Sequence, residues 1–159
     1  PGFLYQQNTM RDAMVAALTL DIFNSHCARV VMANIAQMVN VLQAVILTDG
    51  AKMICTPTYH VFELYKAHHD ANYLPSAITC GECSGVKQLT ATASEKEGVI
   101  TLTATNTSCT DALDVVVHLS GASAKNVIAR ILTGDMHDKN TFEDAEKVTV
   151  KPFSPLSLA

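Results

Sequence analysis

The spacing of apolar residues changes near residue 70, and this change limits the possible folds more than any other feature of the sequence. Before residue 70, apolar residues recur mostly three and four positions apart, which is typical of amphipathic helices. After residue 70 they mostly alternate with polar residues, which is typical of strands with one exposed face. We therefore expect an α+β chain in two parts, with helices prominent in residues 1–70 and antiparallel strands in residues 71–159.

Local signals place two helices and a hairpin in residues 1–70. Thr9-Met-Arg-Asp12 carries the hydroxyl and the carboxylate of a capping box, which predicts a helix over residues 9–25. Thr48-Asp-Gly-Ala51 predicts a turn that joins residues 44–47 to residues 52–56 in a hairpin. Pro57 suits the first turn of a second helix, which we expect to end near residue 67.

The run Arg29-Val-Val-Met-Ala33 is short, mostly apolar and rich in β-branched residues, which predicts a strand buried on both faces. Such a strand needs parallel neighbours and helices on both sides of its sheet, and residues 1–70 do not supply them. We therefore expect this part to be the end of a larger α/β domain. Because the chain starts at Pro1 without Met or a targeting signal, we also expect an upstream part, and the localisation stays unknown.

Alternating runs predict the structure of residues 71–159. Residues 86–94 and 99–105 alternate on either side of Glu95-Lys-Glu-Gly98, which predicts a β-hairpin. Further runs at 114–119, 126–132 and 147–150 predict three more strands, with Gly121 and Gly134 in the connections. The expected fold of this part is an antiparallel β-sandwich.

The charge of the chain excludes two classes of partner. Residues 59–159 hold eight basic and twelve acidic side chains, which account for the whole formal charge of −4, and no basic cluster occurs. Nucleic acids and anionic membranes both attract basic patches, so we expect neither as a partner. The most apolar run, residues 30–47, carries Asn and Gln on all sides of a helix and does not predict a membrane span.

Cysteines and histidines give weak signals for a metal or a cofactor. Cys80-Gly-Glu-Cys83 has the spacing of a zinc or redox motif, but the nearby second ligand pair would have to be His68 and His69. Gly81, Ser84 and Gly85 favour a turn between strands instead of the helix that opens a thioredoxin-like site. The other histidines show no ligand spacing. We therefore predict no metal and no cofactor, and leave open whether the two cysteines bind a metal.

Four segments together resemble the glycoside hydrolase family 51 α-L-arabinofuranosidases. They are Gln6–Leu20 (QQNTMRDAMVAALTL), Val31–Gln43 (VMANIAQMVNVLQ), Leu47–Phe62 with its Thr-Asp-Gly turn, and Asn140–Glu143 (NTFE). The resemblance covers essentially the whole chain. It implies that residues 1–70 are the last elements of a (β/α)8 barrel and that residues 71–159 form a jelly-roll-like sandwich.

The resemblance also implies retaining hydrolysis of terminal arabinofuranosyl units in arabinose-containing oligo- or polysaccharides. That chemistry needs two carboxyl groups about 5–5.5 Å apart, which in the family are glutamates on earlier barrel strands. No Glu precedes Glu63, and Asp12, Asp21 and Asp49 read as residues of a helix cap, a helix and a turn. We therefore expect no catalytic residue in this chain and no activity of the chain alone.

Gln37 is the candidate substrate-binding residue, because it matches a family glutamine whose amide binds arabinose hydroxyls. A neutral amide offers a donor and an acceptor to vicinal hydroxyls without burying a charge. From spacing alone, Asn34, Gln37 and Asn40 read as residues that satisfy backbone groups in a loop. The resemblance changes this interpretation for Gln37, and we expect the two asparagines to be structural.

The alternative function is an independent carbohydrate-binding module in residues 71–159. The tyrosines could form a sugar-stacking platform, but most of them flank helices and the chain has no Trp. The chain ends after Lys151-Pro-Phe-Ser-Pro-Leu-Ser-Leu-Ala159, where we expect a missing strand to leave an open sheet edge. Such an edge and the exposed barrel surface predict possible self-association.

Overall fold

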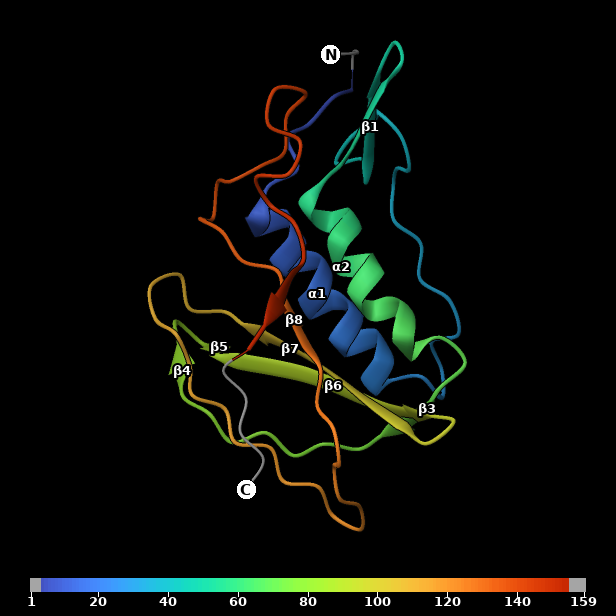
Figure 1. The fold of residues 1–159 in the computed structure, drawn as a ribbon, viewed down its shortest axis with the longest axis vertical. Coiled ribbons are helices and arrows are strands. Elements are labelled where there is room, and N and C mark those ends of the chain that lie inside the picture. The colour runs from blue at the N-terminus through green and yellow to red at the C-terminus, as the bar shows by residue number, and fades with distance from the viewer. Residues whose placement is uncertain (1–3, 155–159) are drawn as a thin grey trace.

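Two helices lie side by side between a β-hairpin and a three-stranded sheet (Figure 1). The computed structural model describes residues 4–154, so the expectations on Pro1–Phe3 and on residues 155–159 lie outside the described residues. The helices are α1 (Met10–Ser25) and α2 (Pro57–Tyr65), and α2 continues into the 3-10 turn η1 (Lys66–His68). Both helices predicted from the sequence are confirmed. Neither helix in the described part of the chain is long and apolar enough to cross a membrane.

The predicted capping box starts α1. One carboxylate oxygen of Asp12, Oδ2, accepts the backbone N–H of Thr9 at 2.7 Å and its hydroxyl at 2.8 Å. These bonds satisfy polar groups that the first turn of a helix leaves without partners. The carboxylate also lies in the first turn of α1, where an acidic side chain stabilises a helix.

The main core lies between α1, α2 and a C-terminal segment. The small side chains Ala13 and Ala17 allow α1 to approach α2 closely, where Val61 and Tyr65 face them. Val148, which is fully buried, closes the core from the C-terminal side. The helical period of α1 is confirmed, but the buried face is only partly the predicted one: Met10 and Ala17 are buried, whereas Ile22, which the apolar spacing places on the same face, is 59% exposed.

The hairpin consists of β1 (Ile46–Asp49) and β2 (Lys52–Cys55), which are antiparallel with Asp49 opposite Lys52. Gly50 has a φ of +56°, a conformation that a tight hairpin turn requires and that glycine adopts without strain. A second small core of Ala44, Leu47 and Ile54 anchors the base of the hairpin. The hairpin predicted from the Thr-Asp-Gly signal is confirmed.

The main sheet has the strand order β3-β6-β7 and is antiparallel. Its strands are β3 (Asn72–Leu74), β6 (Leu89–Lys96) and β7 (Val99–Asn106). The predicted hairpin is confirmed, with a tighter turn than expected, because Glu97 and Gly98 alone connect β6 to β7 at positive φ values. Cross-strand pairing places hydroxyl side chains together on the face toward the helices: Thr90 with Thr105, Thr92 with Thr103, Ser94 with Thr101.

Two small sheets complete the described structure. In one, β4 (Glu82–Cys83) pairs with β5 (Val86–Lys87) across the turn predicted at Ser84 and Gly85. In the other, β8 (Ala129–Ile131) pairs with β9 (Lys151–Phe153) beside the helices (Figure 1). Helices and antiparallel strands together confirm the α+β class, and the strand-rich C-terminal part is consistent with a sandwich.

The prediction of a buried strand at Arg29–Ala33 is wrong. Among the described residues these five have no strand partner, and the side chains of Val31 and Met32 are 92% and 73% exposed. A strand forms when neighbouring backbone groups complete its hydrogen bonds, and here no such neighbour is present in the described structure.

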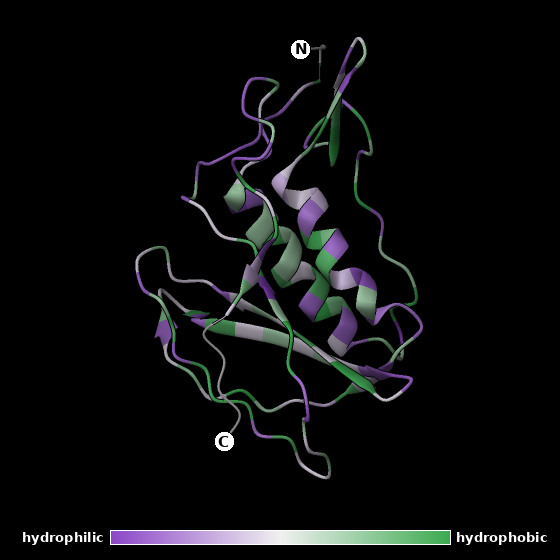
Figure 2. Cartoon of the chain, in the orientation of Figure 1, coloured by the Kyte–Doolittle hydropathy of each residue, from purple (hydrophilic) through white to green (hydrophobic). Residues whose placement is uncertain are grey.

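The predictions of strands at 114–119 and 147–150 are also wrong, and the strand predicted over 126–132 is reduced to β8. Val116 and Ile128 are 77% and 93% exposed, and Figure 2 shows hydrophobic residues along these loop segments. Alternation marks residues that suit a strand, but the strand itself depends on a partner. After residue 147 the chain instead buries Val148, and pairing begins three residues later at β9.

Candidate functional site

The segment Gln37–Asn40 runs along strand β1 and is joined to it by backbone hydrogen bonds. The carbonyl of Gln37 accepts the N–H of Val45 at 3.4 Å, and the carbonyl of Met38 accepts the N–H of Ile46 at 3.0 Å. The N–H of Asn40 donates to the carbonyl of Ile46 at 3.1 Å. The backbone that carries Gln37 is therefore tied to the hairpin and not to α1.

The side chain of Gln37 is exposed. Within the described part of the chain, its amide makes no hydrogen bond to another residue, so both its donor and its acceptor are free. The peptide bond between Ala36 and Gln37 is cis. An exposed, unpaired amide can bind a pair of sugar hydroxyls, one as donor and one as acceptor.

Asn40 has the structural role expected from the sequence. Its Oδ1 accepts the backbone N–H of Thr48 at 2.7 Å, and its Nδ2 donates to the Thr48 hydroxyl at 2.8 Å. Its φ of +60° lies in the left-handed region, which asparagine tolerates better than most residues. Asn34, the other asparagine of this loop, lines the groove described below.

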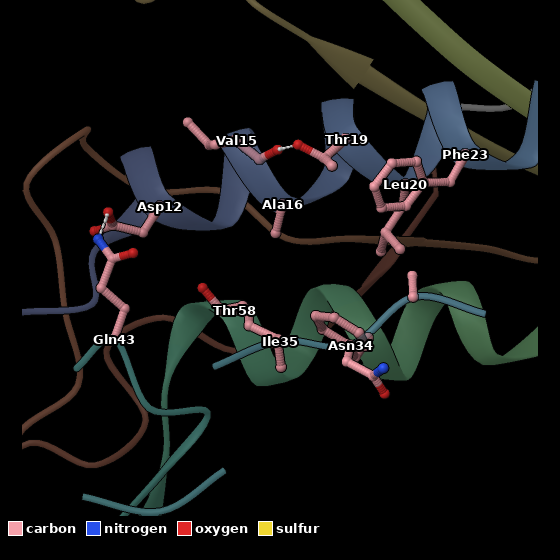
Figure 3. Close-up of a pocket in the computed structure, with 12 residues that line it drawn as sticks. Asp12, Val15, Ala16, Thr19, Leu20, Phe23, Asn34, Ile35, Gln43 and Thr58 are labelled. Carbon is pink, nitrogen blue, oxygen red and sulfur yellow. Dashed lines mark hydrogen bonds between the residues drawn. The ribbon is translucent and has the colours of Figure 1, made fainter. Parts of the chain in front are cut away.

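Polar side chains join the N-terminal ends of α1 and α2. Asn8, which is 6% exposed, donates to the Thr58 hydroxyl at 2.8 Å and accepts the Thr58 backbone N–H at 3.2 Å. The Gln43 amide donates to Oδ1 of Asp12, as Figure 3 shows. Because each group has a partner, these bonds fix the start of α2 and the end of the Gln37 loop against the start of α1.

A groove of about 200 Å³ lies between α1, α2 and the loop at residues 33–35 (Figure 3). Asp12, Gln43 and Thr58 close one end of it. Apolar side chains of α1 and α2 form much of the remaining wall: Val15, Ala16, Leu20, Phe23, Phe62. The polar groups at its end already have partners, Gln43 with Asp12 and Thr58 with Asn8, so the groove offers contacts to apolar groups and few to a sugar.

The acidic residues of the helical part serve the fold. Asp12 caps α1, and Asp49 is the exposed last residue of β1. Glu63 on α2 lies 3.2 Å from the His60 ring and 3.7 Å from the Arg130 guanidinium. Asp12 therefore has the position that the sequence predicted, whereas Asp49 ends β1, directly before the turn at Gly50 and Ala51.

Asp21 links the helices to the main sheet, a role that sequence reasoning missed. It is 6% exposed, and its two oxygens accept the Tyr65 and Thr90 hydroxyls, both at 2.6 Å. Burial raises the pKa of Asp21 above its ordinary value, and these hydrogen bonds offset part of that effect. Burial also raises the pKa of Tyr65, as does the adjacent Asp21 charge. The sequence carried one signal for this role: Asp21 follows Ala13 and Ala17 at intervals of four residues, which places it on the buried face of α1.

His68 makes a second link between helix and sheet. Its ring nitrogens lie 2.7 Å from the Ser94 hydroxyl and 3.1 Å from the Thr103 hydroxyl. Burial lowers the pKa of His68, and the neighbouring His69 lowers it further. From the sequence, His68 was considered only as a metal ligand together with His69, Cys80 and Cys83.

No metal centre forms within residues 4–154, because no three His, Cys, Asp or Glu side chains come together there. All five cysteines are free thiols, including Cys80 and Cys83. Of the tyrosines considered as a sugar-stacking platform, Tyr65 is instead buried and bonded to Asp21. The described residues thus form an amide-bearing loop, an apolar groove and structural hydrogen bonds between the helices and the main sheet.

Comparison with known proteins gives the same family throughout. The whole chain, residues 1–159, matches the family described as alpha-L-arabinofuranosidase C-terminal domain. An intracellular exo-alpha-L-arabinofuranosidase from Bacteroides ovatus is 45% identical over 164 residues, which is 99% of this chain and 32% of the relative. The family 51 arabinofuranosidase of Xanthomonas axonopodis pv. citri is 44% identical, with a TM-score of 0.87 over 97% of this chain and 32% of that one.

An α-L-arabinofuranosidase from Thermotoga maritima, solved as an arabinose complex, is 25% identical, with a TM-score of 0.84 over 94% of this chain and 35% of that one. The chain therefore spans about a third of the length of the relatives it matches. The family resemblance found in the sequence is confirmed: the chain belongs to the α-L-arabinofuranosidase C-terminal domain family.

Proposed function

We propose that residues 1–159 act as the C-terminal part of a longer retaining α-L-arabinofuranosidase that removes terminal arabinofuranosyl units from arabinose-containing oligo- or polysaccharides. One observation carries the proposal. The chain matches 97–99% of its length to enzymes of this activity, at 44–45% identity, yet corresponds to 32% of their length. A match to a third of the relatives' length supports a part that contributes to a larger active site, and not a part that holds a complete active site by itself.

In this proposal both catalytic glutamates lie upstream, and the chain alone is inactive. The retaining reaction needs a free carboxylate as nucleophile and a carboxylic acid to protonate the leaving oxygen. The carboxylates of Asp12, Asp21 and Glu63 are instead held by structural partners. Their hydrogen bonds and ion pairs support a scaffolding role for this part of the chain.

We also propose that α1, residues 29–33 and α2 are the last elements of a (β/α)8 barrel, and that the sandwich begins near residue 71. Val31 and Met32 support this: they form no strand in this chain, but a β-branched, apolar and exposed segment has the composition of a strand whose neighbours belong to another part of the protein. The barrel surface would then cover these side chains. Self-association of the separate chain through the same surface stays a prediction.

Gln37 is the proposed substrate contact. Its amide is exposed and lies on a loop that follows the proposed last barrel strand, and catalytic faces of such barrels are built from the loops that follow strands. An amide without a protein partner can bond arabinose hydroxyls in both directions. Asn34 and Asn40 have no assigned contact with the sugar.

A chimaera tests the proposal: the upstream two-thirds of the Xanthomonas enzyme joined to residues 1–159 of this chain. We expect it to hydrolyse 4-nitrophenyl α-L-arabinofuranoside, while the 159-residue chain and the upstream part are each inactive alone. Turnover by the 159-residue chain comparable to that of the Xanthomonas enzyme would contradict the proposed division of labour. A chimaera that melts cooperatively but shows no turnover would contradict the proposed activity.

Substitution of Gln37 tests the substrate contact in the same chimaera. Loss of one or two hydrogen bonds to hydroxyls that move toward the transition state should lower kcat/KM by about 10- to 1000-fold in Gln37→Ala. The melting temperature should hardly change, because the amide has no partner in the described structure. Unchanged kinetics with a melting temperature several degrees lower would assign Gln37 a structural role instead.

A further inference from the structure

We propose that Asn40 is a positioning residue for the Gln37 amide: it fixes the Gln37 loop to the β1–β2 hairpin through Thr48. The inference rests on the proposed substrate contact of Gln37. It adds a residue that touches no substrate and whose effect on activity passes through Gln37.

The loop has little else to hold it. Residues 36–40 are all exposed, and the side chains of Met38 and Val39 are 64% and 41% exposed, so apolar packing contributes little to their position. The hairpin, in contrast, is anchored by the buried side chains of Ala44, Leu47 and Ile54. The hairpin is therefore the fixed element, and bonds to it determine where the loop lies.

Asn40 makes most of the side-chain contribution to this attachment. Its amide bonds both the backbone N–H and the hydroxyl of Thr48, at 2.7 Å and 2.8 Å, which fixes the side chain in one orientation. Its backbone N–H bonds Ile46 at 3.1 Å, and Ile46 in turn bonds Met38 at 3.0 Å. Only Met38 and Val39 separate Asn40 from Gln37, and both ends of this short segment are bonded to the same stretch of chain.

The residue type fits this position. At a φ of +60° an alanine or a β-branched residue would be strained, and glycine would keep the backbone but lose both side-chain bonds. Asn40→Gly therefore isolates the side-chain bonds from the backbone conformation. Asn40→Asp keeps the acceptor for the Thr48 N–H and tolerates the same φ.

A double-mutant cycle in the chimaera tests the inference. We expect Asn40→Gly to lower kcat/KM by about 5- to 50-fold, since a displacement of about 1 Å suffices for losses of that order. In the Gln37→Ala background the same change should cost less than about 2-fold, because the group it positions is gone. Asn40→Asp should keep kcat/KM within about 3-fold of the unsubstituted chimaera.

The matched control is Asn106, whose side chain also bridges a loop, with the Asp111 carbonyl at 2.7 Å and the Ser108 N–H at 2.9 Å. It lies at the end of β7, outside the loop and the hairpin. Asn106→Gly should leave kcat/KM within about 2-fold, as expected for a bond of the same kind away from the site.

If Asn40→Gly lowers kcat/KM equally in the presence and in the absence of the Gln37 side chain, the inference is overturned but the Gln37 contact stands. The same holds if Asn40→Gly lowers kcat/KM by less than about 2-fold while Gln37→Ala lowers it strongly. If Gln37→Ala is itself unimpaired, the proposed contact fails and the inference with it. Amide hydrogen exchange of the 159-residue chain gives a readout independent of turnover. Asn40→Gly should raise the exchange rate of the Ile46 N–H about 10-fold relative to the Thr56 N–H, which bonds Val45, and an unchanged ratio would overturn the inference.

Discussion

Removal of the Asp21 carboxylate should destabilise the chain strongly. Asp21→Ala removes the acceptor that the Tyr65 and Thr90 hydroxyls each bond at 2.6 Å, which leaves Tyr65 only the Ala17 carbonyl at 3.2 Å and leaves the half-buried Thr90 hydroxyl to water. Loss of a hydrogen bond to a buried carboxylate costs about 1–3 kcal/mol, and relief of the carboxylate's own desolvation returns part of the cost of losing two, so we expect a net loss of about 1–3 kcal/mol. Asp21→Asn keeps the shape and one acceptor oxygen and should cost less than about 1 kcal/mol at neutral pH.

The raised pKa of Asp21 also gives its contribution a pH dependence of defined sign. Between the ordinary pKa and the raised folded pKa, the native chain holds a proton that the unfolded chain has released. The contribution of Asp21 to stability is therefore greatest below the unfolded pKa and falls as the pH rises through the folded pKa. Asp21→Asn removes this dependence, so its stability relative to the unsubstituted chain should improve from pH 4 to pH 7.

Urea unfolding followed by circular dichroism at both pH values measures these differences. Asp49→Ala is the matched control, because Asp49 is exposed at the hairpin end and should change the free energy of unfolding by less than about 0.5 kcal/mol. The account of Asp21 as the link between helices and sheet fails if Asp21→Ala costs no more than this control. It also fails if Asp21→Asn becomes relatively less stable as the pH rises.

Two further predictions concern buried polar side chains. Because the pKa of His68 is lowered in the folded chain, its contribution to stability is lost as the pH falls from about 6.5 through the folded pKa. The stability advantage of the unsubstituted chain over His68→Gln, measured in urea melts, should therefore shrink from pH 7.5 to pH 5. Equal advantages at both pH values would contradict this. Asn140 bonds the Cys55 carbonyl and both backbone groups of Val148, each at 2.8 Å. Asn140→Ala should therefore lower the free energy of unfolding by about 2–4 kcal/mol in the same urea melts. A loss below about 0.5 kcal/mol would contradict this and show that water replaces these bonds.

The sequence predicts the elements whose signals are local. The Thr9 and Asp12 cap, the turn before Lys52 and the turn at Gly98 each lie within a few residues of the structure they determine. The helical period of α1 follows from the spacing, but the face that α1 buries follows only in part. These predictions are confirmed because few other parts of the chain enter into them.

The strand predictions that failed are those for segments without a local partner. Residues 29–33 and 114–119 have strand-like composition, yet neither has a partner among the described residues. The hydrogen bonds of a strand are completed by another segment, which composition does not identify.

The buried polar contacts were missed for a related reason. Asn8 and Thr58 are 50 positions apart, and Asp21 and Thr90 are 69 apart. A polar residue on an apolar helix face, such as Asp21, signals that a partner exists, but not which one. Gln37 was found through the family resemblance, and its exposed amide alone would not distinguish it from other loop residues.

The most direct test of the central claim is a crystal structure of the chimaera soaked with arabinose. The account predicts arabinose bound next to the Gln37 loop, with the amide within about 3.2 Å of at least one sugar hydroxyl, and Asn40 still bonded to Thr48. Arabinose bound in the chimaera with the Gln37 amide beyond hydrogen-bonding distance would contradict the claim that this chain contributes to the arabinose site.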